Sequence, residues 1–316
     1  MVLLYIPPVQ NLLRREVTAY ASKATGMQIQ VERIDLRFPL NLLVRGVEVI
    51  QQPDTLLSLE SLNVRVQAWP LLKGKVEVDE VTLSQVAVNS ANLIEGMQIK
   101  GVLGRFFLQS HGVDLSNETA VVNRTELSDT HIQLLMTDTT TTPKDTTASA
   151  PVNWKVNLHQ LKLKNVSFGM KLPADSMKMA AYIGEATIDD AKADLKNQFY
   201  GLKQFLLSGA SASYDTGEAQ PSEGFDASHM AVRNIRIGLD SLLYEGRNMN
   251  AVIREITMEE RSGLSITSLT GRLFSNDSII RIPELKLQPH IQNRPVRPDL
   301  LGTRKYPDDR TFIRQL

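Results

Sequence analysis

Histidine side chains can bind metal ions, and the spacing of the histidines in this chain decides whether a metal site is expected. The 316 residues contain five, at His111, His131, His159, His229 and His290. No two of them are separated by one or three residues, the spacings that place two imidazoles on one metal ion. We interpret them as surface or strand-edge residues, and the sequence predicts no metal site.

The acidic pairs and the glycines also lack the arrangement of a catalytic or phosphate-binding site. Adjacent acidic residues occur at Asp189–Asp190, Glu259–Glu260 and Asp308–Asp309. In an extended strand two neighbours point to opposite faces, which suits solvent better than paired acid–base catalysis. The segment Gly101–Gly104 lacks the Lys and Ser/Thr of a phosphate loop, and no Gly-x-Ser-x-Gly is present. We therefore predict a non-enzymatic protein with no catalytic residue and no cofactor.

The charge balance and the absence of cysteine exclude further classes. Lys and Arg number 35, as do Asp and Glu, so the net charge is zero and no basic face is expected to follow a phosphate backbone. Nucleic acid is therefore not an expected partner. The chain has no cysteine, which excludes disulfides and thiolate metal sites and leaves the cellular compartment open.

One pattern recurs along the chain: an apolar residue, two others, an apolar residue, one other, and an apolar residue. Its copies are Val31-Ile34-Leu36, Leu59-Leu62-Val64, Val78-Val81-Leu83, Leu158-Leu161-Leu163, Ile183-Ala186-Ile188, Leu202-Phe205-Leu207, Val232-Ile235-Ile237, Ile253-Ile256-Met258 and Ile282-Leu285-Leu287. Alternation on either side of the two-residue step is the period of a β-strand. Stacked copies of one β unit are typical of proteins that act through a long surface rather than a pocket.

The two-residue step has two interpretations. A bulge inside a continuous strand would insert one residue, bend the strand and keep the apolar side chains on one face. Repeated at one level across many strands, such bulges would curl the sheet. A tight turn between two short strands fits the same spacing equally well.

The pattern divides the chain into five regions. Residues 1–26 hold the apolar segment Met1–Ile6, expected to be the end of a membrane anchor, and an amphipathic helix over Pro8–Thr25 that places Arg14 on its polar side. Residues 27–136 form a first β-repeat region, in which Ile94–Gly104 predicts a bent strand or a turn. Residues 137–151, rich in Thr and without a large apolar side chain, predict a disordered loop. Residues 152–288 form a second β-repeat region, and residues 289–316 predict a disordered tail.

The first part of the chain resembles the N-terminal part of the TamB-like branch of the AsmA-like superfamily, in the form found in Bacteroidetes. The resemblance is carried by Ile6–Gln10, Thr25–Gly26, Ile29–Leu36, Phe38–Leu40, Leu43–Val49, Asp54–Leu57 and Leu62–Val64. It covers residues 5–90 well, whereas residues 91–288 share only the strand pattern.

The resemblance implies a fold, a location and partners. Members of this family are envelope proteins held in the inner membrane by one N-terminal helix, with a taco-shaped β-groove that is apolar inside and crosses the periplasm. They act as bridges for phospholipid and in outer-membrane biogenesis together with an Omp85-type barrel. Most of the membrane helix and the long C-terminal part of the family are lacking from this sequence, so we expect a fragment of such a bridge.

We therefore predict a mainly β protein: an elongated, curled antiparallel β-sheet groove with one N-terminal amphipathic helix. The alternatives are a closed β-sandwich with the same residues as core, a scaffold whose sheet edges bind client strands, and an adhesin built of β repeats. The candidate residues lining a lipid groove are the alternating apolar pairs of the repeat, namely Ile34, Leu36, Leu62, Val64, Val81, Leu83, Leu161, Leu163, Ile235, Ile237, Ile256, Met258, Leu285 and Leu287.

Overall fold

The structure, a computed structural model, describes residues 7–38, 40–67, 77–91, 93–94, 96–114, 117–136, 153–217 and 220–291. These residues form one α-helix, a short 3-10 turn and a sheet of 15 strands. The elements are α1 (Pro7–Thr25), β1 (Gln28–Arg37), β2 (Asn41–Gln51), β3 (Asp54–Val66), β4 (Val78–Asn89), β5 (Met97–Asp114), β6 (Thr119–Met136), β7 (Lys155–Leu172), η2 (Pro173–Asp175), β8 (Met177–Asp194), β9 (Phe199–Leu202), β10 (Gln204–Asp215), β11 (His229–Glu245), β12 (Asn248–Glu260), β13 (Leu264–Ser275), β14 (Ile280–Arg281) and β15 (Lys286–Ile291).

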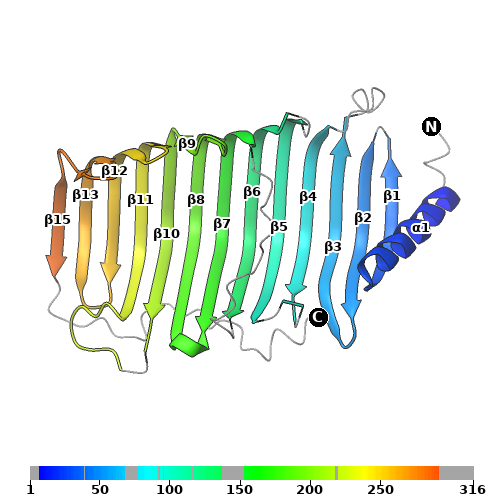
Figure 1. The fold of residues 1–316 in the computed structure, drawn as a ribbon, viewed down its shortest axis with the longest axis horizontal. Helices are drawn as coiled ribbons and strands as arrows, with labels where there is room; N and C mark the ends of the chain where they lie inside the picture. Colours follow the sequence, from blue (N-terminus) through cyan, green and yellow to red (C-terminus); the bar gives the residue numbers. More distant parts are fainter. Residues whose placement is uncertain are drawn as a thin grey trace.

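The strands lie side by side almost entirely in chain order (Figure 1). Strand β9 pairs with the ends of β8 and β11, and β14 and β15 both pair with β13. The predicted mainly β fold with a single N-terminal helix is confirmed. The described strands form one continuous sheet rather than two packed sheets, so the two predicted β-repeat regions are joined.

The prediction of an antiparallel sheet is wrong at one place. Strand β7 pairs with β6 in parallel, whereas the other neighbouring strands are antiparallel. Antiparallel strands can be joined by a tight turn, but parallel strands need a longer connection. The connection from Met136 to Lys155 includes the predicted loop 137–151, which lies outside the described residues.

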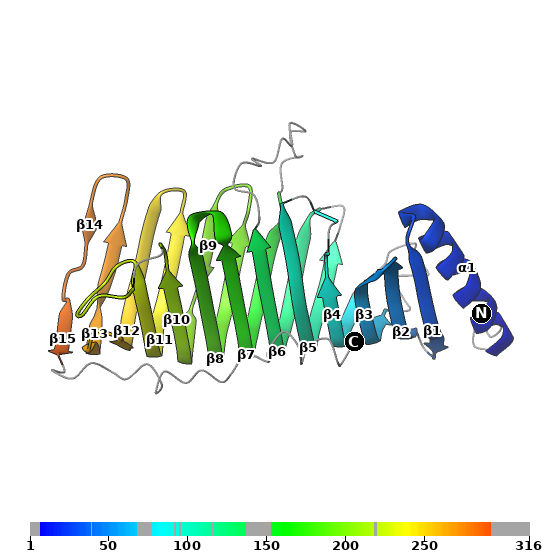
Figure 2. The same cartoon turned by 90° about the horizontal axis from the view of Figure 1, so that it is seen from below.

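Helix α1 runs along the free edge of β1 (Figures 1 and 2). Gly26, at φ +69°, ends the helix in the left-handed conformation that favours glycine, and its N–H donates to the carbonyl of Ser22. The predicted helix is therefore confirmed.

Three polar side chains, separated by multiples of four residues, attach α1 to the edge of β1. Gln10 Nε2 donates to the carbonyl of Leu36 at 3.0 Å, and Arg14 Nη1 donates to that of Glu32 at 2.7 Å. The N–H of Ile29 donates to Ser22 Oγ at 3.1 Å. Arg14, predicted to lie on the polar side of the helix, thus satisfies a carbonyl of the edge strand with its guanidinium group. Covering an edge strand in this way removes a surface to which another strand could pair.

A line of irregular positions crosses the sheet at one level. Between β1 and β8 the paired register skips one residue of every strand: Glu32, Gly46, Glu60, Gln85, Gly104, Asp129, Asn165 and Gly184. We call these residues the bend line. Positive φ angles occur at Gly46, Gln85, Asp129 and Asn165. Each strand continues through its irregular residue, so the two-residue step is an irregularity inside a strand and not a turn.

The bend line explains how the repeat keeps its apolar residues on one face. All strands from β1 to β8 carry the irregularity at the same level, so the register is the same on both sides of it. Irregularities of this kind bend a strand. Figure 2 is turned by 90° from Figure 1, so strands that lay flat in the plane of Figure 1 would be seen end-on there. The long strands are instead seen extended, as expected if they bend out of that plane.

Two glycines of the bend line are needed because neighbouring backbones approach closely. A Cβ on Gly184 would lie 2.9 Å from the carbonyl oxygen of Gly209, and one on Gly104 would lie 2.7 Å from Cβ of Asp129. Gly104 belongs to the segment Ile94–Gly104, predicted as a bent strand or a turn. The structure favours the bent strand over the turn from Met97 onward, because β5 starts at Met97 and continues through Gly101 and the irregular position Gly104.

We expect Gly184→Ala to destabilise the protein by about 1–3 kcal/mol, because the added methyl group would displace the backbone of β10. Gly169→Ala in β7 is the matched control, since its Cβ would meet only Cγ of Gln133, at 3.9 Å. Urea denaturation of both variants measures the difference. Equal midpoints for the two would show that the close approach at the bend line is not rigid.

The boundary predicted for the C-terminal tail also needs correction. Strand β15 runs to Ile291 and pairs with β13, so the sheet continues three residues into the segment 289–316. The rest of that predicted tail, residues 292–316, lies outside the described residues.

Candidate functional site

Strand β7 shows most clearly how the sheet separates its two faces. The residues that alternate on either side of its irregular positions are all apolar on one face: Val156, Leu158, Leu161, Leu163, Val166, Phe168, Met170 and Leu172. The other face carries polar and charged side chains, among them Gln160, Lys162 and Lys164. We call the first the apolar face and the second the outer face of the sheet.

Register pairing extends the apolar face across the whole sheet. Directly paired residues of neighbouring strands share a face. One chain of such pairs runs from β1 to β15 through Ile34, Val44, Leu62, Leu83, Phe106, Leu127, Leu163, Ala186, Leu207, Ile237, Ile256, Leu269 and Leu287. Every member of this first ladder is apolar.

A second ladder runs beside the first, two residues away along each strand except β12, where Ile253 lies three residues from Ile256. Its members are Leu36, Leu42, Val64, Val81, Leu108, Thr125, Leu161, Ile188, Phe205, Leu239 and Ile253. Thr125 is the one member that is not apolar. Together the ladders form a continuous apolar band on one face of the sheet.

The structure brings most of the predicted residues into these two ladders. Three lie elsewhere on the same side. Ile235 pairs with Ala210, and Met258 pairs with Ile266, one step beyond the first ladder. Leu285 precedes β15, with its Cα 3.4 Å from the position of a Cβ on Gly271.

The predicted groove residues include none from β2, β5, β6, β8, β10 or β13, and in β2 and β5 the apolar pattern itself is obscured. Val44 and Leu42 belong to the run Leu42–Val44, in which the apolar residues do not alternate. Phe106 and Leu108 are likewise obscured by Phe107, whose side chain belongs to the outer face. Only the pairing partners on β3, β4 and β6 identify which of these residues face the ladders.

The apolar face is open. No large side chain in the described part of the chain is fully buried, and most ladder residues are half-buried. Half of the buried apolar residues in this part of the chain are alanines, for example Ala186, Ala210 and Ala251. Leu285 and Leu287, at the β15 end, are each 46 % exposed. Apolar groups of a ligand could therefore contact the ladders without displacing a packed core.

The outer face is held together by polar contacts between neighbouring strands. Asn165 Nδ2 donates to Asp129 Oδ1 at 2.6 Å along the bend line, and the Nδ1 atom of His131 lies 2.6 Å from Ser167 Oγ. The position of the proton in the second contact depends on the histidine tautomer. These pairs join β6 to β7 and form a polar surface. Among the contacts of the described residues, no third group completes a catalytic triad with either pair.

Asp190 is the centre of a small charged cluster on this face. Lys203 Nζ donates to it at 2.8 Å and His159 Nδ1 lies 3.1 Å away, and these hydrogen bonds lower the pKa of the Asp190 carboxyl. Because this pKa is lower in the folded state, the ionised carboxylate stabilises the folded protein at pH values above the ordinary carboxyl pKa. This stabilisation is lost as the pH falls through the lowered pKa. The side chains are exposed, so the cluster is a surface contact of minor weight.

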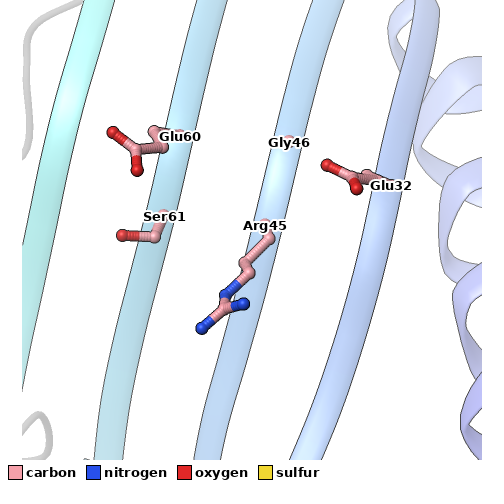
Figure 3. Close-up of a pocket in the computed structure, with 5 residues that line it drawn as sticks. All are labelled: Glu32, Arg45, Gly46, Glu60 and Ser61. Atoms are coloured by element: carbon pink, nitrogen blue, oxygen red, sulfur yellow. The ribbon is translucent and has the colours of Figure 1, made fainter.

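A shallow hollow on the outer face marks the bend line at β1–β3 (Figure 3). Glu32 points from β1 toward Gly46 on β2, and Arg45 extends toward β3. A Cβ on Gly46 would lie 2.6 Å from Oε2 of Glu32, so the hollow exists because the strand needs glycine there. Its open, mixed-charge lining of Glu32, Arg45, Glu60 and Ser61 does not form a binding site.

The described residues form neither a metal-binding cluster nor a membrane-spanning helix. No three His, Asp or Glu side chains are grouped so that they could hold a metal ion. None of the described helices has the length and hydrophobicity to cross a membrane.

No protein-family model matches this chain, and no curated protein matches its sequence. The function of the apolar face has to be inferred from its own geometry and from the resemblance of residues 5–90.

Proposed function

We propose that this chain is a non-enzymatic lipid-handling protein, and that the two ladders form a path for acyl chains. The observation that carries the proposal is the first ladder, which stays apolar from β1 to β15 while most of its side chains remain half-buried. A sheet whose apolar face served only as a core would bury it against a second layer.

The energetics of acyl chains suit such a band. Each methylene transferred from water to an apolar surface contributes about 0.8 kcal/mol. A long apolar surface can gain this free energy from many methylenes of one acyl chain without a specific pocket. A ladder of Leu, Ile, Val and Phe side chains offers such a surface. Bending of the strands at the bend line would make this face concave.

The resemblance to TamB-like proteins supports the same function and suggests a cellular location and a partner. On that basis we propose a bacterial envelope protein, anchored in the inner membrane with a periplasmic body, that forms the N-terminal part of a bridge for phospholipid. An Omp85-type barrel is the proposed outer-membrane partner. Phospholipid is the proposed cargo.

The test is a photo-crosslinker placed on each face of β7. At Leu163, in the first ladder, we expect capture of phospholipid when the protein is expressed in bacterial cells. At Lys164, the next residue along the strand and exposed on the outer face, we expect little or none. Extraction and mass spectrometry of the adducts measure both. Equal lipid capture at the two positions would contradict the proposal.

A second candidate function rests on the far edge of the sheet. Every residue of β15 whose burial is described is exposed, and among the described residues no strand pairs with its outer edge, whereas α1 covers the edge of β1. Such an edge could add an extended client strand, as a scaffold for outer-membrane protein assembly would. In the same experiment a crosslinker at Gln288 would then capture polypeptide while Leu163 captures no lipid.

A further inference from the structure

Apolar exposure on the apolar face is concentrated at one end of the central strands. Val88, Gly101, Ile132 and Phe168 are paired in sequence from β4 to β7, beyond the bend line from the ladders. Ile132 is 39 % exposed and Phe168 is 40 % exposed. Small neighbours, Gly101 on one side and Ala181 on the other, leave these two side chains uncovered.

Methionines line the same end of the sheet. Met170 on β7 pairs directly with Met179 on β8, which is 39 % exposed. Met97 pairs with Met136 between β5 and β6, and Met177 follows the η2 turn. We call these five residues the methionine rim. Methionine is flexible and polarisable, and it is favoured where a surface has to accept apolar groups of variable shape.

The opposite ends of the same strands are closed by comparison. Ala120 and Val122, at the start of β6, are only 8 % exposed each. On the outer face of the same end, Lys155 Nζ and Asp194 Oδ2 form an ion pair of 3.4 Å that joins β7 to β8. Within the described parts of β4–β8, the large apolar side chains that are more than a third exposed, Val88, Ile132, Phe168 and Met179, all lie at the end of the methionine rim.

Two lysines stand at the methionine rim. Lys171 and Lys178 are direct register partners across the η2 turn, and both are exposed. Like charges directly opposite each other destabilise a strand pair. Asp215 is the register partner of Lys178 on β10, yet among the described residues no ion pair of either lysine is formed. Asp175 in the turn is the other nearby carboxylate. An anion bound between the two ammonium groups would relieve their repulsion.

Building on the proposed function, we propose that an anionic phospholipid enters the apolar face at the methionine rim. Its acyl chains would lie against Phe168, Met170 and Met179, and its phosphate would bind between Lys171 and Lys178. The lysines project from the outer face one residue from the strand ends, and their long flexible side chains can bring the ammonium groups to the rim. Charge complementarity at the rim selects an anionic headgroup over a zwitterionic one.

The test uses the full chain and vesicles holding equal parts of phosphatidylglycerol and phosphatidylcholine, each with a distinguishable photoreactive acyl chain. Wild-type protein is expected to capture the phosphatidylglycerol in clear preference. We expect Lys171→Gln/Lys178→Gln to lower the capture ratio about tenfold, since each lysine near a lipid surface attracts anionic lipid. Lys162→Gln/Lys164→Gln, with the same charge change in the middle of β7, is the control and should leave the ratio unchanged.

The outcomes separate this inference from the proposed function. Capture of both lipids without preference in the wild type, or an equal loss of preference in both double variants, would overturn the role of Lys171 and Lys178. Absence of lipid capture by any form of the protein would overturn the proposed function as well. The rim lysines are exposed, so circular dichroism of the double variant should match the wild type and confirm that folding is unaffected.

Discussion

Replacing Leu163 by Asp is expected to abolish lipid capture by the apolar face while the sheet remains folded. Leu163 lies in the middle of the first ladder, between Leu127 on β6 and Ala186 on β8. An acyl chain crossing this point would have to contact a carboxylate, and removing that charge from water without a partner costs several kcal/mol. We expect capture of phospholipid to fall at least about 100-fold.

The cost to folding should be smaller because the face is open. Leu163 is half-buried, so water can still reach a carboxylate at this position. We expect a loss of about 1–3 kcal/mol in the free energy of unfolding, measured by urea denaturation.

Thr187→Asp is the matched control for the same charge. Thr187 is adjacent to Ala186 in β8 and lies on the outer face, opposite Lys162. The new carboxylate would be near an ammonium group and away from the proposed path, so lipid capture should stay at the wild-type level. Comparable losses in Leu163→Asp and Thr187→Asp would show that the apolar face is not the route.

Removing the polar attachment of α1 is expected to have the second large effect. The triple variant Gln10→Ala, Arg14→Ala and Ser22→Ala deletes three side chains that bond the edge of β1. A hydrogen bond of this kind contributes about 1 kcal/mol, and one from a charged donor about twice that. Docking of the helix should weaken by roughly 3–4 kcal/mol in total.

Two measurements follow the consequences of this loss. Hydrogen exchange should speed up for amides of β1, because the helix no longer protects its edge. Sedimentation should show concentration-dependent association through the uncovered edge strand. Arg15→Ala with Lys23→Ala, two exposed residues of the same helix, is the control. A monomeric triple variant with unchanged exchange would mean that α1 is held to β1 by other contacts.

The strand pattern was readable from the sequence because side-chain direction in a strand depends only on local backbone geometry. The pairs Leu161–Leu163 and Val81–Leu83 were predicted to share a face, and the register places all four in the two ladders. The two-residue step between copies was visible too. Whether it meant a bulge or a turn depended on the pairing partners, and the positive φ of Asn165 within a continuous β7 decided it.

The helix illustrates the limit of periodicity. The steps of three and four residues predicted its position correctly, because helix formation is local. They did not indicate that the polar side, which holds Arg14, would contact the sheet. An edge strand presents unpaired carbonyl and N–H groups, so a polar stripe binds it better than an apolar one. The sequence contains no local sign that the helix would meet an edge.

The sequence by itself determined the mainly β composition, the apolar side of most strands and the N-terminal helix, because periodicity, turn residues and charge act over a few residues. The tertiary structure alone decided the parallel pairing of β6 with β7, the alignment of irregular residues into the bend line and the pairing of Lys171 with Lys178. Each of these depends on which strands meet and in which register, and register is set by contacts between residues far apart in the chain.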